Sequence, residues 1–179
     1  MKLRTALQLG RVSNLPTVWT NTLAGAMLAG AAGASLGVGF GVMLLAFSLF
    51  YVGGMFLNDA FDAKFDAQVR PQRPIPSGDV SVDQVFRIGF AMMGAAIALL
   101  GWIGFGFEPR VGAGPALVGA ALAATITWYD WNHKQNRFSP VIMGLCRVLV
   151  LLGAGLCVTG NPDAALYGAA ALMLCYLIG

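Results

Sequence analysis

Six runs of mostly apolar residues, each near the length of a membrane-crossing helix, set the strongest constraint on how this chain can fold. They cover residues 15–33, 39–57, 84–106, 112–129, 140–160 and 164–179. A helix needs about 20 apolar residues to cross the hydrocarbon core of a bilayer. In lipid, a helix satisfies its backbone hydrogen bonds within one segment. The pattern therefore predicts an all-α fold, a polytopic transmembrane helix bundle with five complete spans and a sixth.

The composition argues against a soluble or nucleic-acid-binding protein. The chain is 58% hydrophobic and 11% charged, whereas soluble domains carry about 25% charged residues. The net charge is +3, but the basic residues stand between the apolar runs and form no stripe with interleaved aromatic residues. We therefore expect membrane lipids as partners and no nucleic acid.

The last apolar run bears on the domain organisation. It begins at Ala164 and reaches Gly179 without a flanking charge or polar cap. A membrane helix usually ends among polar or aromatic interface residues. We therefore expect residues 1–179 to form a single transmembrane helical domain that is the N-terminal two thirds of a longer protein.

Basic residues are unevenly distributed between the two sets of connections, and this orients the predicted spans. The basic residues near the first, second and fourth spans are Lys2, Arg4, Arg11, Lys64, Arg70, Arg73, Lys134 and Arg137. The opposite connections hold few basic residues, and cytoplasmic loops are enriched in Lys and Arg. We therefore expect an integral membrane protein whose N-terminus and polar loops, 58–83 and 130–139, face the cytoplasm.

The sequence NDAFDAKFD at the end of the second span is the sharpest chemical signal. On a continuous helix, Asn58, Asp62 and Asp66 would share one face, with Asp59 at its edge. Carboxylates this close need a counter-charge, and only Lys64 lies within the run. Mg²⁺ is commonly held by a few carboxylates together with substrate phosphate oxygens. We therefore predict a site for Mg²⁺ and a diphosphate, against the plainer reading of a solvated helix end.

The segment RPQRPIPSG follows this cluster and could bind phosphate. Arg70 and Arg73 can donate paired hydrogen bonds to phosphate oxygens, while three prolines stiffen the loop. Arginines beside a span are equally often topological anchors. Both interpretations stay open for these two residues.

A second polar cluster, TWYDWNHKQNRFSP, follows the fourth span on the same predicted side. Lys134 could contact phosphate, and Tyr129 and Asp130 could line the mouth of the site. Aromatic residues and lysines also gather at membrane interfaces without any catalytic role. His133 is the only histidine, and we assign it no role as a base or ligand.

Polar residues inside the predicted spans are candidates for contact with substrate. Arg147 lies within the fifth span, where a guanidinium needs an acid or a bound phosphate. Asn14 and Asn21 share one face of the first span. They could bind substrate or hydrogen-bond neighbouring helices.

The motifs resemble the UbiA superfamily of intramembrane prenyltransferases, in a 4-hydroxybenzoate polyprenyltransferase-like or EboC-like branch. NDAFDAKFD matches the NDxxDxxxD signature, RPIPSG matches the segment after it, and RVSNLPTVWTNTLAG and MGLCR are also similar. The resemblance implies a UbiA-like bundle of nine helices, about six of which are present here. It also implies a second acidic motif of the DxxxD type, which these residues lack, so the fragment alone is expected to be inactive.

The resemblance further implies Mg²⁺-dependent transfer of a prenyl group from a prenyl diphosphate to an aromatic or lipid-like acceptor, here expected in a bacterial inner membrane. Asn58, Asp59, Asp62 and Asp66 are the implied metal ligands. Asp62, Asp66 and Lys134 are the expected catalytic residues. The expected substrate-binding residues are Arg70, Arg73, Tyr129, Asp130, Arg147 and Asn21.

Three other functions were weighed against prenyl transfer. A non-catalytic UbiA-like component that binds or moves an isoprenoid or a precursor remains open. A CDP-alcohol phosphotransferase would need a DG followed by AR, which the sequence lacks. A transporter would show broken helices in corresponding positions of two halves, and no such pair is present.

Overall fold

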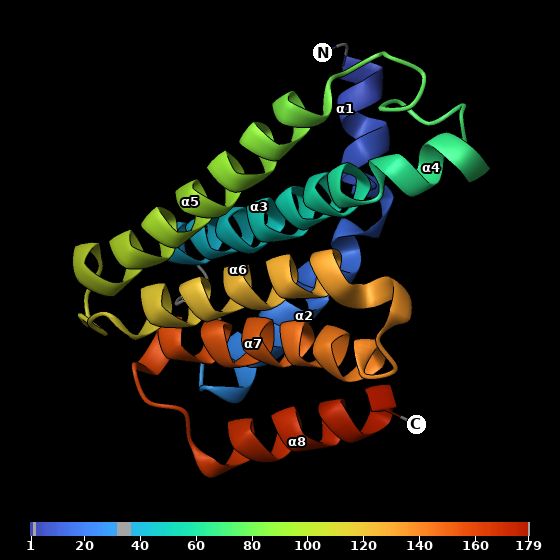
Figure 1. Ribbon diagram of the computed structural model, residues 1–179. Coiled ribbons are helices and arrows are strands. Elements are labelled where there is room, and N and C mark those ends of the chain that lie inside the picture. Colours follow the sequence, from blue (N-terminus) through green and yellow to red (C-terminus); the bar gives the residue numbers. More distant parts are fainter. Residues whose placement is uncertain (2, 32–36, 179) are drawn as a thin grey trace.

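The computed structural model describes the chain except for residues 2, 32–36 and 179, and every regular element in the described part is helical (Figure 1). The ends of the first and sixth predicted spans, residues 32–33 and 179, lie outside the described residues. The α-helices are α1 Leu3–Gly10, α2 Leu15–Leu28, α3 Val38–Phe61, α4 Ala63–Val69, α5 Val82–Gly106, α6 Gly114–Asn132, α7 Ser139–Thr159 and α8 Ala164–Ile178. Short 3₁₀ turns lie at Val12–Asn14 (η1) and His133–Gln135 (η3).

The predicted helix bundle is confirmed, and its helices follow the predicted spans closely. Within the described residues, α3, α5 and α7 are long and apolar enough to cross a membrane. The described parts of α2 and α8 are shorter, at 14 and 15 residues. The last turns of α6 are polar, carrying Asp130 and Asn132. The chain is therefore an integral membrane protein of the predicted helical class.

The helices form one layered bundle whose long members run side by side (Figure 1). α3 packs most extensively against α5, α6 packs on α7, and α7 also contacts α2 and α8. Large buried side chains fill the centre, among them Phe47, Phe50, Leu57, Leu100 and Leu122. α1 lies across one end of the bundle and contacts α3.

Small residues allow α3 and α5 to approach closely. A Cβ atom on Gly53 would lie 3.0 Å from the carbonyl oxygen of Gly89, and one on Gly89 would lie 2.8 Å from Leu57 Cδ2. Small residues at such crossings let membrane helices pack backbone to backbone. This contact holds the C-terminal half of α3 against α5. The acid cluster, Asp59, Asp62 and Asp66, begins at the end of this half.

The helix is interrupted within the acid cluster. α3 ends at Phe61 and α4 begins at Ala63, with Asp62 between them (φ −80°, ψ −6°). The backbone ladder nevertheless continues, because Asp62 N–H donates to Asn58 O (3.0 Å) and Asp66 N–H donates to Asp62 O (2.9 Å). The chain bends here rather than unwinding. A single straight face for the cluster, expected for a continuous helix, is therefore not formed.

Candidate active site

Four buried acids lie at one end of the bundle, where α3, α4 and α6 meet the N-terminal segment. Asp59, Asp62, Asp66 and Asp130 are 7%, 9%, 1% and 3% exposed. Buried carboxylates are stable only when they are paired or hydrogen-bonded. The partners of each acid therefore define the site.

Asp59 and Asp66 share one arginine. Arg73 Nη1 lies 2.6 Å from Asp66 Oδ2 and 3.3 Å from Asp59 Oδ1. Arg11 Nη2 contacts the same Asp59 oxygen at 3.1 Å. We call Asp59, Asp66, Arg11 and Arg73 the arginine half of the site. It joins the N-terminal segment, α3, α4 and the loop after α4.

The loop that carries Arg73 is held by its own turns and by apolar anchors. Pro71 disfavours helical backbone at the preceding residue, and Arg70 accordingly leaves the helix at φ −142°. Ser77 N–H then donates to Arg73 O at 2.9 Å. Ile75 and Val80 pack into a small core against α1 and α3. The guanidinium of Arg73 is thus presented from a supported loop.

Asp62 has different partners, although it lies between Asp59 and Asp66 in sequence. Lys134 Nζ lies 2.7 Å from Asp62 Oδ1 and 3.8 Å above the ring centroid of Phe65. His133 Nε2 lies 3.8 Å from Asp62 Oδ2, and its ring stacks on Tyr129 at 5.2 Å. Both bases come from η3, directly after α6. Asp62 therefore links α3 to the second polar cluster.

Asn58 joins the same group through Asp130. Its Nδ2 donates to Asp130 Oδ1 at 3.1 Å, across the contact between α3 and α6. We call Asn58, Asp62, Asp130 and Lys134 the lysine half of the site. The structure thus brings the two predicted polar loops together, and it groups Asp66 with Asp59 rather than with Asp62.

Two carboxylate oxygens in the site keep unused bonding capacity. Asp66 Oδ1 and Asp130 Oδ2 are buried without a hydrogen-bond partner among the described residues. In the described part of the chain, no three His, Cys, Asp or Glu side chains converge closely enough to enclose a metal by themselves. Mg²⁺ does not require such a cage, because substrate phosphates and water complete its shell. Carboxyl oxygens with unused bonding capacity fit Mg²⁺.

The counter-charge was expected from a divalent cation, and basic side chains from outside the nine-residue run supply part of it. Lys64 is exposed and forms no ion pair within the described residues, whereas Arg11, Arg73 and Lys134 all pair with the cluster. Sequence reasoning did not single out Arg11 as a site residue. Its only local signal was a basic residue in the polar break before the first span, since Asp59 is 48 residues away.

Other predicted substrate-binding residues lie further from these contacts. Arg70 Nη1 is 4.0 Å from Asp66 Oδ1 and its side chain is half exposed. Asn21 Nδ2 donates to the Arg147 carbonyl at 2.9 Å, so Asn21 does tie two helices together. Asn21 Oδ1 is buried without a partner in the described part. Roles for Arg70, Tyr129, Arg147 and Asn21 in substrate binding stay predictions.

Known proteins resemble this chain over most of its length. The model of the UbiA prenyltransferase family matches residues 18–179. The digeranylgeranylglyceryl phosphate synthase of Ignicoccus hospitalis is 32% identical over 128 residues, which is 72% of this chain and 38% of that protein. The enzyme of the same name from Methanopyrus kandleri is 36% identical over 98 residues, 54% of this chain and 35% of that protein.

A solved structure described as digeranylgeranylglyceryl phosphate synthase in membranes has the same fold. Its TM-score is 0.76 at 17% identity, and the match covers 98% of this chain and 58% of that one. The regions matched in the Ignicoccus hospitalis and Methanopyrus kandleri enzymes are little more than a third of each of those proteins.

Proposed function

This chain belongs to the UbiA prenyltransferase family, and from that premise we propose that the full protein transfers a prenyl group from a prenyl diphosphate to a lipid-like acceptor in the membrane. The names of the relatives indicate prenyl transfer in general. We also propose that the acceptor is lipid-like and that the reaction depends on Mg²⁺.

The observation that carries the proposal is the pairing of buried acids with bases from three distant segments. Arg73 and Lys134 contact Asp66 and Asp62 at 2.6 Å and 2.7 Å, and each comes from a different one of the two polar loops. A prenyl diphosphate has an anionic head and an apolar tail. A site that combines cations, carboxylates and a membrane setting suits both parts, because desolvated charge-assisted hydrogen bonds to phosphate are strong.

Mg²⁺ is proposed to be held by Asn58, Asp62 and Asp66, with Asp59 beside them. Asp130 joins this proposed set because it has a free oxygen and a hydrogen bond to Asn58. When bound, Mg²⁺ supplies charge neutralisation for the diphosphate.

The protein's own cations complete the proposed chemistry. Lys134 and Arg73 would exchange their carboxylate partners for diphosphate oxygens and stabilise the negative charge that develops as the carbon–oxygen bond breaks. The acceptor then bonds to the first prenyl carbon as diphosphate leaves, and the acceptor's proton passes to solvent or to the released diphosphate. The four acids are buried, so water has little access to them, and exclusion of water protects an allylic cation from capture.

A lipid-like acceptor is preferred to an aromatic one. The relatives are named for a product that contains digeranylgeranylglyceryl and phosphate, and no comparison suggests an aromatic acceptor. The proposed acceptor is therefore a glyceryl phosphate lipid, with Arg147, Asn21, Tyr129 and Arg70 as candidate contacts. A bacterial inner membrane and a cytoplasmic active side remain predictions, since the named relatives are archaeal.

The test is binding of a non-reactive geranylgeranyl diphosphate analogue to the full-length protein, titrated with Mg²⁺ and then with a chelator. We expect Mg²⁺-dependent binding that is lost in Asp62→Asn combined with Asp66→Asn. Asp79→Asn is the matched control, because Asp79 is an exposed acid in the loop after α4. Unchanged binding in the double variant would overturn the site assignment.

A second assay separates catalysis from mere binding. The full-length protein is incubated with geranylgeranyl diphosphate and a geranylgeranylglyceryl phosphate acceptor, and diphosphate release is followed. Product formation supports the enzyme. Tight, Mg²⁺-dependent binding without release for any lipid acceptor would favour the non-catalytic component instead.

A further inference from the structure

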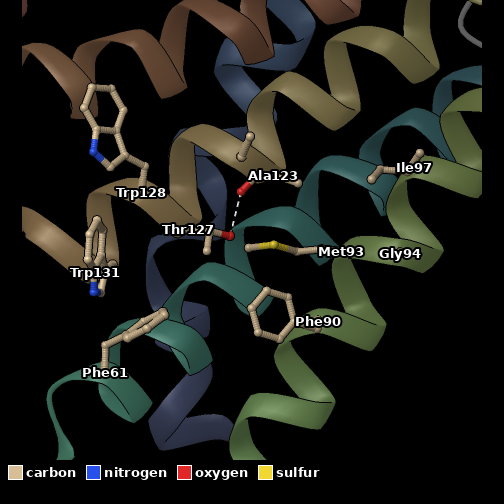
Figure 2. A pocket seen from close by; sticks show the side chains of 10 residues that line it. Phe61, Phe90, Met93, Gly94, Ile97, Ala123, Thr127, Trp128 and Trp131 are labelled. Carbon is tan, nitrogen blue, oxygen red and sulfur yellow. Dashed lines mark hydrogen bonds between the residues drawn. The ribbon is translucent and has the colours of Figure 1, made fainter.

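An apolar groove of about 780 Å³ lies between α5 and α6, with Phe61 of α3 in its wall (Figure 2). Phe61 and Asp62 are consecutive, so their side chains diverge by about 100° around the helix. Phe61 meets Phe86 of α5 edge to face, with ring centroids 4.9 Å apart, whereas Asp62 faces Lys134. The groove is therefore separate from the proposed catalytic site.

The groove exists because α5 and α6 touch at one end and diverge toward the other (Figure 1). At the closed end, a Cβ on Gly119 would lie 2.9 Å from Leu100 Cδ1, and one on Gly101 would lie 3.8 Å from Ala116. Toward the acid-cluster end, a Cβ on Gly94 would meet nothing within 4 Å. The two helices are therefore close together at Gly101 and Gly119 and leave an open space between them beside Gly94.

The lining suits a hydrocarbon chain and no polar ligand. It consists of Phe61, Phe90, Met93, Gly94, Ile97, Ala123, Ala124, Thr127, Trp128 and Trp131. Thr127 is the only lining residue with a hydroxyl, and that hydroxyl donates to the Ala123 carbonyl at 2.8 Å (Figure 2). The indole side chains lie at the wide end, with Trp128 50% and Trp131 72% exposed. Tryptophan is typical of the membrane interface.

A cationic side chain, that of Arg87, lies at the same wide end of the groove. Arg87 precedes Phe90 by three residues and Gly94 by seven, so it continues their stripe along α5. Arg87 is exposed, and among the described residues no carboxylate lies within 4.0 Å of its guanidinium. Ile97 and Arg87 are ten residues apart, about 15 Å along a helix. That length matches one leaflet, half of a hydrocarbon core of about 30 Å.

We propose that the α5–α6 groove binds one chain of an anionic phospholipid from the leaflet on the acid-cluster side, with its phosphate against Arg87. The chain lies between Gly94 and Ala123, and the two indoles flank the glycerol region. A phospholipid fits because the apolar walls of the groove are about as long as one leaflet is thick and end at an exposed cation.

The test uses the full-length protein in phosphatidylcholine vesicles that contain a phosphatidylglycerol with a diazirine on its acyl chain. Photolabelling of the segments 90–97 and 123–131 is measured by peptide mass spectrometry. We expect labelling that unlabelled phosphatidylglycerol suppresses better than phosphatidylcholine does. Equal suppression by the two lipids would overturn the role of the phosphate.

Two pairs of variants test the groove and the cation separately. Gly94→Leu fills the groove and should lower labelling at least tenfold, while Gly41→Leu, at another open glycine position on α3, should not. Arg87→Gln should lower the preference for phosphatidylglycerol about fivefold, and Arg137→Gln should leave it unchanged. Labelling that survives Gly94→Leu overturns the proposal.

Two other occupants give distinct results in the same experiment. If the prenyl tail of the substrate occupies the groove, the non-reactive geranylgeranyl diphosphate analogue will suppress labelling. If a second copy of the chain covers it, wild-type labelling will be absent and Gly94→Leu will change the oligomeric mass. Either result overturns the lipid assignment without affecting the proposed prenyl transfer.

Discussion

The arginine half and the lysine half of the site both draw acids from the nine residues NDAFDAKFD, yet they hold those acids differently. Asp66 is 1% exposed and bound at 2.6 Å by Arg73, a planar donor fixed by a supported loop. Asp62 is bound by Lys134, whose side chain is 34% exposed. A lysine ammonium is a compact charge on a flexible stem, whereas arginine forms rigid paired bonds. The difference suggests that the Arg73–Asp66 pair stabilises the site more than the Lys134–Asp62 pair does, and that Lys134 changes partners more readily when a ligand binds.

Among the variants that test this comparison, Asp66→Asn should have the largest effect on stability. The change removes the 2.6 Å charge-assisted bond to Arg73 but leaves Arg73 its second partner, Asp59, at 3.3 Å. We expect a loss of about 2 kcal/mol in the free energy of unfolding. Denaturant titration of the full-length protein in detergent would measure it. Asp79→Asn is the control, with a change of under about 0.5 kcal/mol. Wild-type stability in Asp66→Asn would mean that the arginine half is not structural.

Asp62→Asn should act mainly on ligand binding and little on stability. We expect the Kd for a prenyl diphosphate analogue to rise about a hundredfold in the presence of Mg²⁺, by analogy with the loss of groups that support a metal site. Stability should change by under about 1 kcal/mol, since the partner lysine is partly exposed. Calorimetric titration and unfolding on the same preparation would check both. A stability loss equal to that of Asp66→Asn would erase the distinction between the halves.

Lys134→Gln tests whether the lysine changes partners when the ligand arrives. A charge-assisted hydrogen bond to phosphate contributes about 1.5–3 kcal/mol, so we expect analogue binding to weaken at least tenfold. Lys134→Arg should recover part of it, because the charge is retained. If Lys134→Gln binds as wild type does, the lysine serves only as the partner of Asp62.

Arg11→Gln should have the smallest effect. The side chain of Arg11 is 39% exposed, and Asp59 keeps Arg73 as a second partner at 3.3 Å. We expect a destabilisation of about 0.5–1 kcal/mol, with little change in analogue binding. Unfolding of Arg11→Gln alone and combined with Asp59→Asn would show whether the two effects are coupled. A large loss of analogue binding would mean that Arg11 contacts the ligand and does not only support the site.

Local sequence pointed to several residues of the candidate site because they lie close together at the end of one apolar run. Asn58, Asp62 and Asp66 stand out as polar residues at the end of an apolar run, and Lys134 stands out in the same way after α6. The grouping of Asp66 with Asp59 could not be predicted, because it depends on a bend at Asp62 and on where Arg73 returns after three prolines. Arg11 was missed because a contact across 48 residues leaves no local pattern.

The sequence by itself determined that the chain forms apolar helices, roughly where they begin and end, and which of their ends carry charge. It could do so because transfer of apolar side chains into lipid and backbone hydrogen bonding within a helix are local properties of each segment. Only the tertiary structure decided which acid meets which base and where α5 and α6 diverge to leave a groove. Those outcomes depend on close approaches such as Gly53 to Gly89 and Gly119 to Leu100, which are set by the packing of several helices at once.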